Sequence, residues 1–268
     1  MKSAAFDYAR PASVAEACSL LAASAGMAKP MSGGQSLGPM LNLRLAQPDS
    51  VIDLAGIAEL RDVRDEDKTL FIGAGVTHAA IEDGQVPDPT WGLLPQVAAN
   101  IAYRAVRNRG TLGGSLAHAD PAADWVNTMR LVDAVYLIDG PNGRREVASG
   151  DFMQAAFTTV LDESEILVGV RIVRCSPGTK FGYFKFCRKV GEFAEAIGAV
   201  LLDPARGVRR AIVGATAGAP YLVRNIDAVL AGDAEAIATE VRAAGCDEPY
   251  EFQMHAVALK RAVAQANA

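Results

Sequence analysis

The sequence RNRGTLGGSLAHADPAAD, residues 107–124, has a glycine pair at its centre. Gly113 and Gly114 stand between two residues with hydroxyl side chains, Thr111 and Ser115. Because glycine lacks a Cβ, such a pair lets the backbone turn tightly and lets a ligand approach the main chain. Successive N–H groups in a turn of this kind form a concave site for an anion. This stretch, the second motif below, therefore predicts an anion-binding loop.

A similar motif lies nearer the N-terminus. The sequence MSGGQSL, residues 31–37, again places a glycine pair between serines and is called the first motif. A single Gly-Gly is more often a plain turn than a binding site. Two such loops in one chain suggest two halves of a cradle for a diphosphate, each half holding part of the group.

The end of the second motif predicts a helix start. Asp120 fits an N-cap and Pro121 fits the first helical position. Asp124 would then lie one turn into the helix, close to the glycine loop. Its carboxylate could accept hydrogen bonds from sugar hydroxyls, or it could simply complement the helix dipole, and the sequence leaves both interpretations open.

Composition excludes several classes of protein. The 268 residues carry a net charge of −5 without a basic block, so a nucleic-acid partner is not expected. No window approaches the roughly 20 apolar residues of a membrane span, and the N-terminus lacks a secretory signal. The cysteines are scattered without C-x-x-C spacing, which predicts no metal site in this chain and a cytoplasmic location. They are Cys18, Cys175, Cys187 and Cys246.

Hydrophobic periodicity and turn residues predict a mixture of helices and strands. A capping box at Ser13 and Glu16 starts a helix, and Thr77 caps another in which His78 is expected on the surface. Further helices are expected at 37–44, 93–100 and 125–132, and strands at 51–54, 60–65, 68–73, 135–138, 144–147 and 165–173. Beyond a proline- and glycine-containing linker at 175–179, strands are expected at 182–187, 196–202 and 209–214, and helices at 223–230, 234–244 and 250–265.

The two motifs resemble the FAD-binding signatures of the molybdenum hydroxylase family, which includes the medium subunit of carbon monoxide dehydrogenase and the FAD domain of xanthine dehydrogenase. The resemblance rests on SGGQS at 32–36 and on TLGGS with ADPAAD at 111–124. It implies an α+β fold with a two-subdomain FAD-binding domain of the PCMH/vanillyl-alcohol-oxidase-like type at 1–175. Its subdomains would cover about 1–55 and 56–175. A C-terminal domain with a three-stranded antiparallel sheet and helices would follow at 176–268.

The same resemblance implies a function. FAD would be the cofactor of this chain, while a large partner subunit carries the molybdenum cofactor and a small one carries [2Fe-2S] clusters. Electrons would pass from those clusters through FAD to an external acceptor, in a complex expected to be a dimer of heterotrimers. No catalytic or metal-binding residue is expected here, because the flavin itself carries the redox chemistry. A self-contained FAD-dependent oxidase or reductase, or a non-catalytic nucleotide-binding module, remains an alternative.

The resemblance also transfers cofactor contacts position by position. The expected FAD-binding residues are Pro30, Met31, Ser32, Gly33, Gly34, Gln35, Ser36, Leu37, Ile101, Thr111, Leu112, Gly113, Gly114, Ser115, Asp124, Leu167 and Lys185. Lys185 could stabilise a reduced flavin by its charge, although a solvated lysine at a strand end is the alternative. Phe193 stands where some relatives carry a tyrosine near the flavin, while Gln35 and Ser115 replace a common histidine and asparagine. These departures leave both glycine pairs intact.

Overall fold

The computed structural model describes residues 2–268, and it begins with a small parallel sheet. Its strands are ordered β1-β3-β2. They are β1 (Asp7–Ala9), β2 (Ala28–Met31) and β3 (Ser50–Asp53). Two helices connect them, α1 (Val14–Ala23) and α2 (Leu37–Asn42). Ser13 caps α1 as expected, since its hydroxyl accepts from the N–H of Glu16 at 3.2 Å.

A five-stranded antiparallel sheet follows, in the order β4-β5-β10-β6-β7. The strands are β4 (Val63–Glu66), β5 (Thr69–Gly73), β6 (Val135–Gly140), β7 (Gly143–Ala148) and β10 (Ile166–Val173). Short 3₁₀ turns, η1 (Leu54–Gly56) and η2 (Ala58–Arg61), lead into it from β3. The strands expected in this part of the chain are therefore present, with their ends shifted by a few residues.

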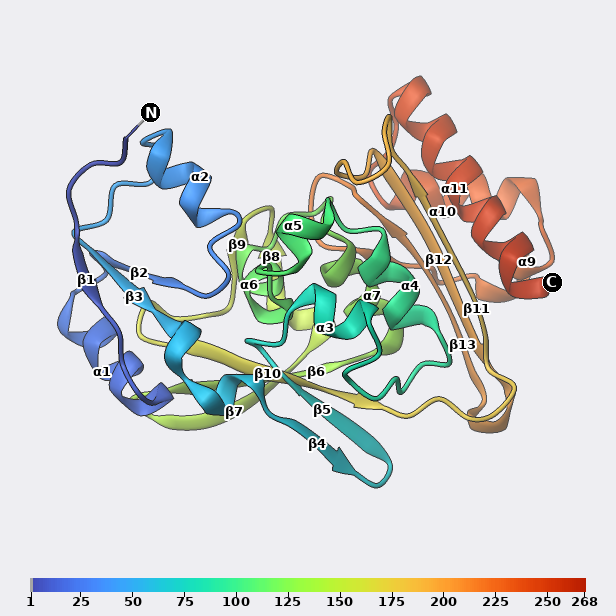
Figure 1. Cartoon of the computed structure of the whole chain (residues 1–268). Coiled ribbons are helices and arrows are strands. Elements are labelled where there is room, and N and C mark those ends of the chain that lie inside the picture. The colour runs from blue at the N-terminus through green and yellow to red at the C-terminus, as the bar shows by residue number, and fades with distance from the viewer. Residues whose placement is uncertain (1) are drawn as a thin grey trace.

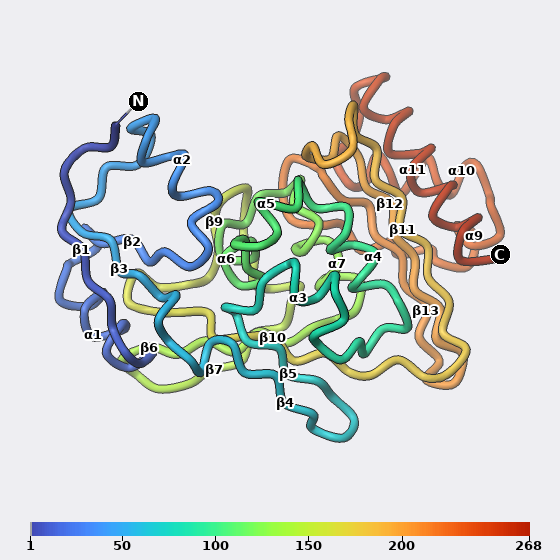
Figure 2. Tube along the Cα trace, viewed as in Figure 1, coloured from blue at the N-terminus to red at the C-terminus, as the bar shows by residue number. Residues whose placement is uncertain are grey.

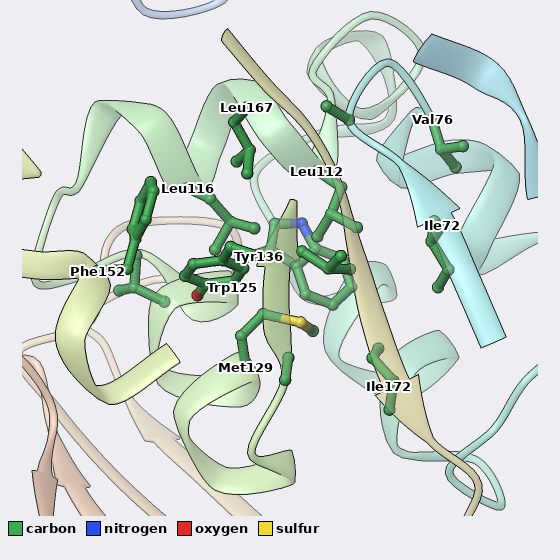
Figure 3. Close-up of a cluster of buried hydrophobic side chains, with 14 of the residues drawn as sticks. Ile72, Val76, Leu112, Leu116, Trp125, Met129, Tyr136, Phe152, Leu167 and Ile172 are labelled. Carbon is green, nitrogen blue, oxygen red and sulfur yellow. The ribbon is translucent and has the colours of Figure 1, made fainter. Parts of the chain in front are cut away.

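Short helices pack on this sheet and form the middle of the molecule (Figure 1). They are α3 (His78–Glu82), α4 (Leu93–Ala99), α5 (Arg104–Arg107), α6 (Leu112–His118), α7 (Asp124–Val132) and α8 (Ser149–Phe152). A small hairpin, β8 (Met153–Ala155) and β9 (Thr158–Thr159), follows α8. Figure 3 shows Leu112 and Leu116 of α6 in the same buried cluster as Trp125 and Met129 of α7, so the second motif is anchored in the core.

The C-terminal part has four strands where three were expected. Its antiparallel sheet contains β11 (Lys180–Phe186), β12 (Ala196–Asp203), β13 (Val208–Gly214) and β14 (Tyr221–Leu222). The fourth strand has two residues, which is too short to produce an alternating pattern. The turn η3 (Pro204–Arg206) joins β12 to β13, and three helices follow: α9 (Ile226–Leu230), α10 (Ala234–Ala243) and α11 (Pro249–Asn267).

The C-terminal sheet is buried on both faces. On β12, Ile197, Ala199 and Leu201 join the main core, whereas Val200 joins a second core beneath the C-terminal helices. This alternation follows from the two-residue period of a strand. The chain thus runs from the parallel sheet at one end to the C-terminal helices at the other (Figure 2). The expected divisions near 55 and 175 fall between sheets, but they remain predictions because one core includes residues on both sides of each division.

Two further observations concern single elements. The helix expected from Pro121 begins only at Asp124, because Asp120 instead closes a turn by accepting from the N–H of Ala122 at 2.9 Å.

Within residues 2–268, no helix combines the length and the apolar character needed to cross a membrane.

Candidate functional site

The two glycine motifs, far apart in sequence, lie against each other. The Thr111 hydroxyl donates to the Ser32 hydroxyl at 3.0 Å. A Cβ added to Gly33 would lie 2.0 Å from the carbonyl oxygen of Arg109, closer than real side chains approach. Glycine is therefore needed at position 33 for the first motif to reach the second.

The first motif presents a series of free backbone donors. Within residues 2–268, no hydrogen-bond acceptor faces the N–H groups of residues 33–37, and helical bonding begins only with Gly38 N–H to Gly34 O at 2.9 Å. Gly34 has φ +71°, a conformation that glycine adopts without strain. The Gln35 side chain donates to the Gly33 carbonyl at 3.2 Å and braces the loop. Consecutive free N–H groups of this kind favour an anionic ligand.

The second motif is built differently from the loop that was expected. Gly113 and Gly114 lie in the first turn of α6, and Thr111 caps that helix by accepting from Gly114 N–H at 3.1 Å. The N–H groups of Leu112 and Gly113 donate to Val76 and Ala74 carbonyls at 2.9 and 2.8 Å. These N–H groups are thus bonded to the segment 74–76 of the same chain, and the expectation that the second motif also offers free N–H groups is wrong.

What the second motif offers is hydroxyl groups and an open surface. Gly113 is a packing glycine, because a Cβ there would lie 2.3 Å from that of Ala74. Gly114 is exposed, and its added Cβ would lie 2.8 Å from the Thr111 hydroxyl and 3.8 Å from Ser32 Cβ. A side chain at 114 would therefore enter the space between the motifs. N–H donors on one side, hydroxyls on the other and a bare Cα between them fit a diphosphate.

Asp124 and Lys185 form a buried ion pair. Lys185 Nζ lies 2.8 Å from one carboxylate oxygen of Asp124, and the Tyr183 hydroxyl donates to the other at 2.9 Å. Only 9% of the Lys185 side chain and 5% of the Asp124 side chain are exposed, so a solvated lysine is excluded. Burial raises the pKa of Asp124, and Lys185 and Tyr183 offset part of that rise. Lys185 also lies 3.4 Å from the Asn100 carbonyl, which places it beside Ile101.

The turn that carries Ile101 is held by an arginine that the sequence did not single out. Arg107 donates to the carbonyls of Ile101 and Ala102, both at 2.9 Å. The other side of its guanidinium binds both carboxylate oxygens of Glu82 at 2.7 and 2.9 Å. A Cβ added to Gly191 would lie 2.8 Å from the Ala102 carbonyl, so the loop after β11 packs on the same turn.

The remaining expected residues lie around this region. Leu167 is 4% exposed and its side chain packs in the core near Leu112 and Leu116 (Figure 3), beside a register shift in β10. Pro30 and Met31 end β2, and Ser36 and Leu37 begin α2. The structure thus gathers the two motifs in one place and Ile101, Asp124 and Lys185 in another.

His78 is not the surface residue that was expected. It is buried, and its Nδ1 accepts from the indole N–H of Trp125 at 2.9 Å. Burial, reinforced by the positive charge of Arg107, lowers the pKa of His78 to about 4. Its backbone N–H donates to the Gly110 carbonyl at 2.9 Å, so His78 also binds the backbone of the second motif just before Thr111.

One group in the C-terminal part has ligand atoms close enough for a metal ion, namely Cys246, Glu251 and His255 within 4.8 Å. The His255 ring already has backbone partners: Nδ1 lies 2.9 Å from the Glu251 carbonyl and Nε2 lies 3.2 Å from the Gly214 carbonyl. Burial and the neighbouring Glu251 raise the pKa of the Cys246 thiol to about 12, which keeps it protonated. These contacts give the group a structural role in fastening α11 to β13.

Comparisons with known proteins agree with this geometry. Residues 4–173 match the family described as the FAD binding domain in molybdopterin dehydrogenase. The chain is 40% identical to the carbon monoxide dehydrogenase medium chain of Hydrogenophaga pseudoflava over 74% of this chain and 69% of that one. It is 34% identical to the carbon monoxide dehydrogenase medium chain of Afipia carboxidovorans, over 98% of this chain and 97% of that one. A solved structure of carbon monoxide dehydrogenase from Hydrogenophaga pseudoflava superposes with a TM-score of 0.90 at 34% identity, covering 99% and 98%.

Proposed function

This chain belongs to the FAD-binding family of the molybdopterin dehydrogenases, and from that premise we propose that it passes electrons from a partner's [2Fe-2S] clusters through FAD to an external acceptor. The observation that carries the proposal is the contact between the two motifs, with the Thr111 and Ser32 hydroxyls 3.0 Å apart. The free N–H groups at 33–37 face an anion there, and FAD provides one as its diphosphate.

The chain's own residues hold and orient the cofactor. When bound, FAD supplies the redox chemistry, and the protein supplies position and local electrostatics. Residues 33–37 donate to the diphosphate together with the hydroxyls of Ser32 and Ser115, while Thr111 holds the Ser32 hydroxyl in place through its own hydrogen bond. Lys185, fixed by Asp124, places a positive charge beside Ile101 at the flavin end of the site. Leu167 and residues 30–32 complete the proposed set of contacts.

The partners follow from a division of labour. The molybdenum cofactor belongs in this proposal to a large subunit and the [2Fe-2S] clusters to a small subunit, as a dimer of heterotrimers. The substrate is chosen by the large subunit. Carbon monoxide is the first substrate to test, because it is named in the relatives.

Co-expression with the proposed large and small subunits tests the proposal. An affinity tag on this chain should recover both partners, and acid release of the pigment should yield FAD. The flavin should be reduced by a substrate of the large subunit only when all three chains are present. Direct reduction by a small substrate with this chain alone would favour the self-contained oxidase or reductase. Recovery without any flavin would favour the nucleotide-binding module.

A further inference from the structure

Phe157 is an aromatic residue displayed at the tip of the β8–β9 hairpin. Its side chain is 60% exposed, and Ala155 and Thr158 of the same hairpin are also exposed. The backbone at Phe157 has φ +57°, a conformation that costs energy for a non-glycine residue. Its N–H donates to the Ala119 carbonyl at 2.8 Å, which ties the hairpin to the end of α6. The strained backbone thus holds a large apolar ring in solvent.

The ring has an aromatic neighbour on α6. The centroids of Phe157 and His118 are 5.2 Å apart, with an angle of 53° between the planes. The residues next to the pair in sequence are small or polar, namely Ala117, Ala119, Ala155, Ala156 and Thr158, so the two rings are the large side chains of this surface. A planar ligand of the size of one base fits such a surface better than a protein partner, whose interface requires a larger apolar area.

The aromatic pair lies at the opposite end of α6 from the space between the two motifs. Gly114, Ala117 and His118 follow the i, i+3, i+4 spacing that places residues on one face of a helix, and Gly114 and Ala117 are exposed. His118 is one turn, about 5.4 Å, along α6 from Gly114. Two small residues leave this face of α6 open between the hydroxyls of the second motif and the rings. Figure 1 shows the β8–β9 hairpin beside α6.

We propose that the exposed Phe157 ring, with the tilted His118 ring packed against it, is a stacking platform for the adenine of the dinucleotide whose diphosphate lies between the two motifs. This inference rests on the proposed function. One ribose separates a diphosphate from its base, and one helical turn separates Gly114 from His118. Every base has a π-face that stacks on an aromatic side chain, and this contact requires no hydrogen-bonding pocket.

The test compares FAD with FMN, which has the flavin but no adenine. Full-length chain, purified from cells that also express the proposed large and small subunits, is stripped of flavin and titrated with each compound. Phe157→Ala should weaken FAD binding between about 5-fold and 150-fold, the range expected for one lost base–aromatic stack, and should leave FMN binding unchanged. Phe157→Trp should restore FAD binding. Tyr250→Ala, which removes an equally exposed aromatic ring from α11, should change neither affinity.

The outcomes separate the platform from the proposed function. If wild type binds FAD and Phe157→Ala binds it equally well, the platform is wrong and the proposed function stands. An equal loss of FAD and FMN affinity in Phe157→Ala would also overturn the platform, because the ring would then act on the fold. Wild-type protein that takes up neither flavin would overturn the proposed function and the platform with it.

Discussion

Gly33 is the first glycine of its pair and Gly114 is the second glycine of its pair, and they face different neighbours. A Cβ at 33 meets the backbone of Arg109, which has no freedom to yield, whereas a Cβ at 114 meets only the Thr111 hydroxyl. Gly33→Ala should therefore separate the motifs, lower the melting temperature and reduce FAD affinity at least about 10-fold, as expected when several charge-assisted hydrogen bonds to the diphosphate are misplaced. Titration of flavin-free protein measures the affinity.

Gly38 provides the matched control for that substitution. It lies four residues beyond the second glycine of the first motif, and an added Cβ there has no neighbour within 4 Å in the described structure. Gly38→Ala should keep full FAD binding. If Gly33→Ala binds FAD as tightly as Gly38→Ala, the close contact between the motifs has no part in the site.

Lys185 and Asp124 depend on each other because both are buried. Lys185→Met would leave the Asp124 carboxylate without its cation, and breaking such a pair typically costs about 3–5 kcal/mol. The double variant Lys185→Met with Asp124→Asn should recover most of this loss, because it removes the unpaired charge and keeps the Tyr183 hydrogen bond. Urea denaturation of the four proteins measures the coupling. Additive effects of the two substitutions would show that the pair is not coupled.

His78 makes the stability of the fold depend on pH. Its pKa is about 4 in the folded state, while an unfolded histidine has a pKa of 6.5. The unfolded state therefore binds the proton more readily between these values, so the free energy of unfolding decreases as the pH falls from 6.5 to 4. The full loss is about 3 kcal/mol at 1.36 kcal/mol per pKa unit.

The comparison with His78→Gln isolates this effect from that of other titrating groups. When the pH falls from 7 to 4, the free energy of unfolding of the wild type should decrease by about 3 kcal/mol more than that of the variant. Denaturant titrations at several pH values, followed by circular dichroism, provide the measurement. Parallel pH profiles for the two proteins would contradict the low pKa of His78.

At the scale of elements, α11 lies directly on the backbone of the C-terminal sheet. A Cβ added to Gly182 of β11 would lie 1.9 Å from the Ala262 carbonyl, and one added to Gly198 of β12 would lie 2.4 Å from the backbone of Ala258. Gly182→Ala or Gly198→Ala should therefore push the helix away and destabilise the protein by about 1–3 kcal/mol or more. Gly218→Ala, with open space around the added methyl group, should be neutral in the same thermal denaturation assay.

The elements also show what the sequence could predict. Helices with a capping signal, such as α1 and α3, and strands with a clear alternation appear where they were expected, because those signals are local. The two glycines of the second motif were interpreted as a loop, since glycine disfavours helices. The Thr111 cap and the bonds to the Ala74 and Val76 carbonyls outweigh that preference, and the latter partners lie far away in sequence.

Like the helices and strands, the candidate site could be predicted from the sequence only where its signals are local. The two motifs were identified locally, but the partners of Lys185, Arg107 and His78 were not. Lys185 and Asp124 are 61 residues apart, and Trp125 and His78 are 47 apart. Such pairs depend on how β11, α3 and α7 pack, and a single sequence carries no direct signal of that packing. The buried histidine was therefore assigned to the surface and the buried lysine was given a solvated alternative.

At the scale of the whole molecule, three exposed apolar side chains gather beside the end of the site where we propose that the flavin binds. Val190 is 77% exposed, Phe193 67% and Tyr103 55%. They are neighbours, because Gly191 packs against the Ala102 carbonyl and Lys189 lies over the Tyr103 ring. Exposed apolar groups in one place are typical of a surface that binds a partner. In the proposed complex, electrons from a [2Fe-2S] subunit would enter close to the flavin, so we expect this subunit to bind here.

Phe193→Asp tests that surface in the assembled protein. The exposed position predicts a change of less than about 0.5 kcal/mol in the stability of the chain itself. Binding of the [2Fe-2S] subunit should weaken at least about 10-fold, because a charge would be buried in an apolar contact. Co-expression and pull-down measure the assembly, and Tyr250→Asp on α11 serves as the control with similar exposure. Recovery of the small subunit by Phe193→Asp at the wild-type level would exclude Phe193 from the interface, and electrons would then have to enter FAD from another side.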